Sequence, residues 1–222
     1  MDAIKRYVNT KEKKVLALWT GGLLLWTLLL LLFTFFREPQ IITITKVETV
    51  PQVAEATLVS GPLIGDAIDY LNEVPIYFNG GVRNTSGRNE STDGYNYGLK
   101  WQCVEFVKRY YYDYLNHRMP NTWGHAREFF NLMLTDGDLN PDRGLYQFRN
   151  GSQYQPRVDD ILVFGIGKYG HVAIISKVTN NYIEFAQQNV GETTRDQLEL
   201  THDNGRWRIR DARVLGWLSK YK

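Results

Sequence analysis

The stretch KWQCVEF at residues 100–106 decides how the middle of this chain folds, because it leads from a loop into a helix. Residues 79–98 before it are rich in Gly, Asn, Ser and Thr, a composition typical of loops. After it, apolar side chains recur with the spacing of one helix face, at Cys103, Phe106, Val107, Tyr110 and Tyr114. We therefore expect an amphipathic helix that begins at the single cysteine of the chain.

A second helix is expected directly behind the first. Asn121 and Thr122 are residue types that favour the N-cap position. A helix that starts there places four apolar residues on one face, namely Trp123, Ala126, Phe130 and Met133.

Short runs of β-branched and aromatic residues predict strands in the remainder of the chain. These runs are Val74–Phe78, Asp160–Phe164, His171–Val178, Tyr182–Gln187, Trp207–Arg210 and Val214–Ser219. Residues 179–181 are polar and short enough to join two of them as a hairpin. Helices followed by hairpin-linked strands predict an α+β fold, with N-terminal helices packed on an antiparallel sheet.

The N-terminal segment is expected to be a membrane anchor. Residues 15–36 form a run of 22 residues without a charge, and a helix of that length spans about 33 Å, enough for a bilayer core. A cleaved signal peptide would have a shorter apolar run that ends in small residues. The basic residues of the tail (1–14) place the N-terminus in the cytoplasm. A stalk (37–59) and a periplasmic or extracytoplasmic domain (60–222) would follow, making a single-pass membrane protein.

Charge and cysteine count exclude several classes of function. The tail carries five basic and two acidic residues, which leaves 21 basic and 22 acidic residues in the rest of the chain. This balance gives no attraction to nucleic acid. One cysteine excludes an internal disulfide and a multi-cysteine zinc site, and the four histidines show no metal-ligand spacing. We expect no metal and no cofactor.

Cys103 and His171 are the residues that point to chemistry. A thiol at a helix N-terminus is favoured as thiolate by the helix dipole, and the unpaired N–H groups there can hold an oxyanion. His171 opens a strand after the glycine of Tyr169-Gly170, which would fix a general base and leave it accessible. From position alone, an inert buried cysteine and a structural histidine remain alternatives.

Gln187 and Asn189 are the candidates for orienting the histidine, because a catalytic base needs an acceptor for its second ring nitrogen. Side chains alternate along a strand, so that Ile183, Phe185, Gln187 and Asn189 share one face. Glu184 should point to the opposite face.

These motifs resemble a known family, the CHAP (cysteine, histidine-dependent amidohydrolase/peptidase) domain, and are most similar to the amidase domain of glutathionylspermidine synthetase/amidase. The similarity rests mainly on WQCVEF at 101–106, GHVAII at 170–175 and AQQNV at 186–190. It implies a papain-like fold, with Cys103 as nucleophile, His171 as base and Gln187 as the third catalytic residue. Gln102 and Asn189 would support the substrate or the oxyanion. The family usually has Glu where this chain has Gln187.

The resemblance implies a thiol amidohydrolase or peptidase that cleaves an amide through an acyl-enzyme. The expected exported location favours peptides of peptidoglycan as substrate. A glutathionylspermidine-type amidase is the first alternative. A non-catalytic binding module is the second, and Gln187 in place of Glu is the feature that favours it.

Overall fold

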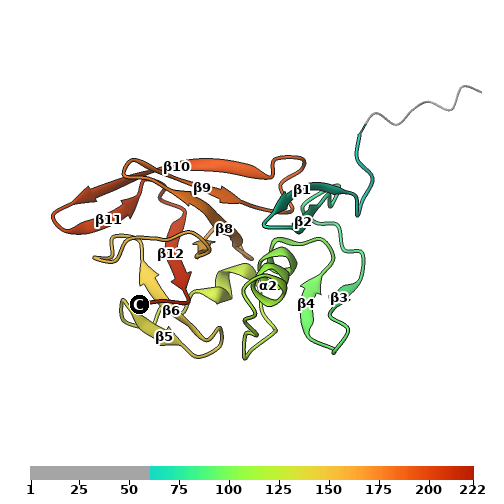
Figure 1. Cartoon of the computed structure of the whole chain (residues 1–222), viewed down its shortest axis with the longest axis horizontal. Helices are drawn as coiled ribbons and strands as arrows, with labels where there is room; N and C mark the ends of the chain where they lie inside the picture. Colours follow the sequence, from blue (N-terminus) through green and yellow to red (C-terminus); the bar gives the residue numbers. More distant parts are fainter. Residues whose placement is uncertain (1–60) are drawn as a thin grey trace, which may run out of the picture. The chain divides into compact units, whose positions relative to one another are not determined.

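The computed structural model describes residues 61–222 (Figure 1). This part of the chain has one α-helix, α2 (Cys103–Asp113), and one 3-10 helix, η1 (Ala126–Phe129). Its strands are β1 (Ala67–Leu71), β2 (Val74–Tyr77), β3 (Arg88–Glu90), β4 (Asn96–Leu99), β5 (Asp138–Asn140), β6 (Leu145–Arg149), β7 (Ile161–Phe164), β8 (His171–Val178), β9 (Tyr182–Ala186), β10 (Arg195–Asp203), β11 (Arg206–Ile209) and β12 (Val214–Ser219).

The main sheet has eight strands in the order β11-β10-β9-β8-β7-β12-β6-β5, and every pair in it is antiparallel. The sheet curls, because Trp207 of the end strand β11 forms a bridge to Ser152, just beyond β6. The Trp207 N–H donates to Ser152 O at 2.7 Å. The curled sheet encloses an apolar core that includes Phe148, Phe185 and the fully buried Trp217.

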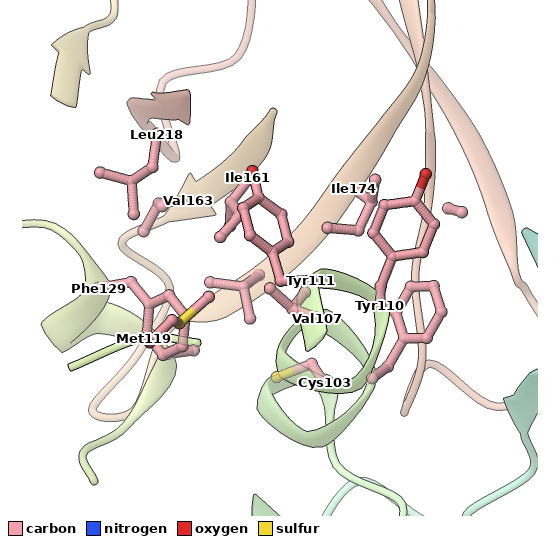
Figure 2. Packing of buried hydrophobic residues seen from close by; sticks show 14 of the residues in the cluster. Cys103, Val107, Tyr110, Tyr111, Met119, Phe129, Ile161, Val163, Ile174 and Leu218 are labelled. Carbon is pink, nitrogen blue, oxygen red and sulfur yellow. The ribbon is translucent and has the colours of Figure 1, made fainter. Parts of the chain in front are cut away.

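A second apolar core lies between the sheet and helix α2. Along β8 the side chains alternate, so that Val172 and Ile174 face this second core while Ala173 and Ile175 face the curled interior. Figure 2 shows Tyr111 of α2 beside Ile161 of β7 and Tyr110 beside Ile174 of β8. Cys103 and Val107 belong to the same buried cluster. The apolar stripe of the helix therefore fixes the nucleophile candidate against the sheet.

The first predicted helix is confirmed. It begins at Cys103, and four of the five residues of the predicted stripe are buried, whereas Tyr114 just beyond its end is exposed. The predicted hairpin at 179–181 is also present, where the Thr179 N–H donates to Tyr182 O at 2.9 Å.

The predicted α+β class, with N-terminal helices packed on a sheet, is wrong. The described residues are mostly β, and the second helix is reduced to the four residues of η1. Gly124 adopts a φ of +107°, which no right-handed helix allows. Trp123 and Met133, placed on its apolar face by prediction, are 62% and 91% exposed. The Asn121 side chain accepts the Trp123 N–H in a turn instead of capping a helix.

The predicted localisation is corrected as well. Within residues 61–222, no helix combines the length and the apolar character needed to cross a bilayer. The tail, anchor and stalk predicted over residues 1–59 lie outside the described residues. The structure therefore does not support the predicted single-pass membrane protein. The boundary of the domain near residue 60 stays a prediction.

Candidate active site

Cys103 occupies the first position of helix α2, preceded by Gln102 in extended conformation. Its side chain is buried at 7% exposure and belongs to the core between helix and sheet. Burial alone would raise the pKa of the thiol. The charge of His171, together with hydrogen bonds from His171 and from the N–H groups of Val172 and Val104, lowers that pKa overall.

His171 is the first residue of β8, and the turn before it depends on Gly170. Gly170 has a φ of +75°, and a Cβ there would lie 2.6 Å from the backbone nitrogen of Arg127. The Arg127 N–H donates to Tyr169 O at 2.8 Å, which ties η1 to this turn. The backbone thus holds the imidazole at a fixed point on the edge of the core, as expected for a positioned base.

The imidazole of His171 lies between Cys103 and Gln187. Its Nε2 donates to Gln187 Oε1 at 2.9 Å, which leaves Nδ1 for the thiol. Burial alone would lower the pKa of His171, but the charge of Cys103 and the hydrogen bonds to Cys103 and Gln187 raise it. The opposite shifts of the two pKa values favour a thiolate–imidazolium pair.

The structure brings Gln187 to the histidine and keeps Glu184 away from it. Gln187 follows β9 directly and is 5% exposed. Glu184 accepts a hydrogen bond from the Ser176 hydroxyl at 3.0 Å and lies 4.0 Å from the Arg195 guanidinium. The side chains therefore alternate as the sequence predicted, and an amide oxygen, not a carboxylate, faces Nε2 of His171.

Gln102 and Asn189 are bound to each other and to a loop. Asn189 Nδ2 donates to Gln102 Oε1 at 2.7 Å, and Gln102 Nε2 donates to Asn84 O at 2.6 Å. Asn189 Oδ1 accepts from Asn79 Nδ2 at 2.7 Å. These bonds order the loop around residues 79–84 close to Gln102, the residue before Cys103. Their predicted role in support of the substrate or the oxyanion stays a prediction.

Gln188 and Glu105 also lie at the site, although they were not predicted as site residues from the sequence. Gln188 is 1% exposed and Glu105 is fully buried, and the Gln188 Nε2 donates to Glu105 Oε2 at 2.8 Å. Glu105 also accepts from Arg109 Nε at 2.6 Å, one helical turn further on. The i,i+4 spacing of Glu105 and Arg109 is visible in the sequence, but the contact with Gln188 joins residues 83 positions apart.

Among the described residues, no cluster of three or more His, Cys, Asp or Glu side chains could hold a metal ion. The chemistry available at this site is that of a thiol, an imidazole and backbone N–H groups. This set suits nucleophilic attack on a carbonyl carbon and proton transfer to a leaving group.

The site coincides with a family match. Residues 93–189 match the CHAP domain and include Cys103, His171 and Gln187. The chain is 33% identical to the bifunctional glutathionylspermidine synthetase/amidase of Escherichia coli (strain K12) over 138 residues, which are 54% of this chain and 22% of that protein.

Two further relatives come from Crithidia fasciculata. Trypanothione synthetase is 27% identical over 163 residues, 66% of this chain and 25% of that protein. Glutathionylspermidine synthase is 31% identical over 137 residues, 55% of this chain and 19% of that protein. The chain thus spans a quarter or less of the length of these relatives. The resemblance inferred from the motifs is confirmed, because residues 93–189 match the CHAP domain.

Proposed function

We propose that this protein is a cysteine amidohydrolase in which Cys103 is the nucleophile, His171 the base and Gln187 the residue that orients the base. The observation that carries the proposal is the contact series from thiol to imidazole to Gln187 Oε1, which ends in the 2.9 Å hydrogen bond. The lowered pKa of Cys103 and the raised pKa of His171 both favour the thiolate form of Cys103.

The reaction proceeds through an acyl-enzyme. The Cys103 thiolate attacks the amide carbonyl, and a carbon–sulfur bond forms. Backbone N–H groups at the start of α2 stabilise the oxyanion. The His171 imidazolium gives its proton to the leaving nitrogen as the carbon–nitrogen bond breaks. Neutral His171 then removes a proton from water as the water oxygen attacks the acyl carbon. Cleavage of the carbon–sulfur bond releases the acid and restores the thiolate–imidazolium pair.

We propose a glutathionylspermidine-type amide as the substrate. Support comes from the relatives, since one of them carries the word amidase in its name. Peptidoglycan peptides were expected because of the predicted exported location. Since that localisation is corrected, it no longer favours peptidoglycan as the substrate. Both substrates contain an amide that the same chemistry would cleave, so they are compared directly.

The test incubates the full chain with glutathionylspermidine and, separately, with purified peptidoglycan, and identifies products by mass spectrometry. Release of spermidine by the wild type but not by Cys103→Ala supports the proposal. Release of peptides from peptidoglycan alone would replace the substrate and keep the mechanism. If neither substrate is cleaved and Cys103 alkylates no faster than in the denatured chain, the domain is a binding module and the proposal fails.

A further inference from the structure

The side chain of Gln188 connects three separate parts of the domain. Its Oε1 accepts the backbone N–H of Tyr77 in β2 at 2.8 Å. Its Nε2 donates to Gln102 O at 3.0 Å and to Glu105 Oε2 at 2.8 Å. Both amide hydrogens and the amide oxygen are therefore used, and the side chain is buried at 1% exposure. A fully bonded, buried amide has one orientation, because rotation would leave donors and acceptors unpaired.

The contacts of Gln188 lie on both sides of the catalytic pair. Gln102 directly precedes the nucleophile, and its carbonyl also accepts the Phe106 N–H in the first turn of α2. The backbone neighbour of Gln188 is Gln187, which binds His171. Cys103 and His171 come from different elements, so their separation depends on how the start of α2 is held against the end of β9.

We propose that Gln188 is a positioning residue that sets the distance between the Cys103 thiol and the His171 imidazole. This inference rests on the proposed function. Gln188 acts through Gln102 and Glu105 on the helix side and through Gln187 on the histidine side. Displacement of reacting groups by about 1 Å can cost about 10²-fold in rate, so a loose connection here would weaken the thiolate–imidazolium pair and the rate together.

Glu105 makes the connection rigid on the helix side. Its carboxylate accepts from Asn89 Nδ2 at 2.8 Å and from Arg109 Nε at 2.6 Å, in addition to Gln188. Each oxygen thus has a fixed donor, and the charge is balanced by the guanidinium of Arg109. Gln188 therefore donates to a carboxylate whose orientation is fixed by its other hydrogen bonds.

Gln147 offers a matched control, because it is an equally buried amide, hydrogen-bonded through both its oxygen and its nitrogen, away from the site. It is 1% exposed, its Oε1 accepts from the Asn131 N–H at 2.8 Å and from Asn140 Nδ2 at 3.1 Å, and its Nε2 donates to Asn131 O at 2.8 Å. Gln147→Ala should cost stability as Gln188→Ala does, but without any change at Cys103.

The experiment measures the pKa of Cys103 from the ultraviolet absorbance of the thiolate, together with kcat and KM, in Gln188→Ala and Gln147→Ala. We expect Gln188→Ala to raise the pKa of Cys103 and to lower kcat by about 10- to 100-fold, with KM within about twofold. Gln147→Ala should lower Tm and leave the other quantities unchanged. If Gln188→Ala does not fold, Gln188→Met keeps the side-chain length and removes the hydrogen bonds.

A charge exchange provides a second test. Gln188→Glu places a carboxylate against Glu105 and should lower kcat, since neither group has a hydrogen to donate. Adding Glu105→Gln restores a donor between the two positions and should recover at least about tenfold of the lost rate. No recovery, or equal effects of Gln188→Ala and Gln147→Ala on the pKa of Cys103, would overturn the inference. An ordinary thiol pKa in the wild type would instead overturn the proposed function beneath it.

Discussion

The two ends of helix α2 differ in their buried titratable groups: those near its start are charged and paired, whereas the carboxyl near its other end is held neutral. At the start of the helix, Cys103 is paired with His171, and Glu105 is paired with Arg109. The hydroxyls of Tyr110 and Tyr111, near the other end, donate to Asp159, the neighbour of Asp160 in sequence. Asp160 is 3% exposed, and its carboxyl Oδ2 accepts the Arg157 N–H at 2.8 Å. Burial raises the pKa of Asp160 from 3.8 to about 7, although hydrogen bonds from Ser219 and Arg157 oppose the shift.

The difference between the two ends is the presence of a partner charge. A buried ion is costly unless an opposite charge and hydrogen bonds compensate for the water it has lost. His171 supplies that compensation to the Cys103 thiolate. At Asp160, the hydrogen bonds and the charge of Arg157 do not outweigh burial, and the charge of Asp159 adds to the rise in pKa. The same low-dielectric interior therefore keeps charge at the candidate site and suppresses it at the other end of the helix.

Removing His171, the partner charge of Cys103, should have the largest effect on activity. In His171→Ala, burial would dominate and the pKa of Cys103 should rise, because the imidazolium no longer opposes desolvation. We expect kcat/KM to fall by at least about 10³-fold, and alkylation of Cys103 by iodoacetamide at neutral pH to slow. An unchanged alkylation rate would show that the thiolate does not depend on His171.

Gln187 tests how the partner charge is oriented. Gln187→Ala removes the acceptor 2.9 Å from His171 Nε2 and should lower kcat by about 10²-fold, with Tm nearly unchanged. Gln187→Glu places a carboxylate beside the imidazolium and should raise the pKa of His171 further. The thiolate–imidazolium pair then survives to higher pH, so the alkaline limb of kcat/KM should move upward while the acid limb moves less. A limb that moves downward would contradict this orientation.

Asp160 tests whether burial without a compensating ion pair keeps a carboxyl neutral. Its pKa is raised in the folded state, so its contribution to stability is full below pH 4 and is lost as pH rises through about 7. Asp160→Asn keeps an acceptor for the Arg157 N–H and removes the titration. Relative to wild type, the free energy of unfolding of this variant should increase by about 2 kcal/mol between pH 5 and pH 8.

The measurement for Asp160 is urea unfolding of both proteins at the two pH values. Because both proteins share Cys103 and His171, the titration of that pair cancels in the comparison. A difference between variant and wild type that stays constant with pH would mean that Asp160 is already ionised at pH 5.

Glu184 should give the smallest effect. It carries a charge on β9 close to Gln187 in sequence, yet its side chain binds Ser176 and faces away from His171. Glu184→Gln should leave kcat/KM within about twofold, because surface ion pairs contribute little. A large loss of activity in this variant, together with an active Gln187→Ala, would mean that the carboxylate of Glu184 orients the histidine.

Local patterns predicted several elements at their observed positions. The strands β8 and β12 have the predicted bounds, and α2 starts at the predicted cysteine. The two strands contain apolar residues at consecutive positions and are buried on both faces, whereas the apolar residues of the helix repeat at the helical spacing. The second helix was wrongly predicted because Gly124 adopts a positive φ that a right-handed helix does not allow. Strand β10 was missed because its sequence RDQLELTHD is mostly polar; all nine residues pair with β9 or β11, and only Leu200 is buried.

The sequence by itself predicted that Cys103, His171 and Gln187 form one candidate site, and on which face of its strand Gln187 lies, because the alternation of a strand is a local property of the backbone. Only the tertiary structure decided that the sheet curls back onto residue 152, and that Gln188 and Glu105 join the site. These contacts join residues far apart in the chain, such as Gln188 with Tyr77 and Gln102. Such pairings depend on how layers pack, and hydrogen-bond partners of a buried amide are fixed only once the surrounding core excludes water.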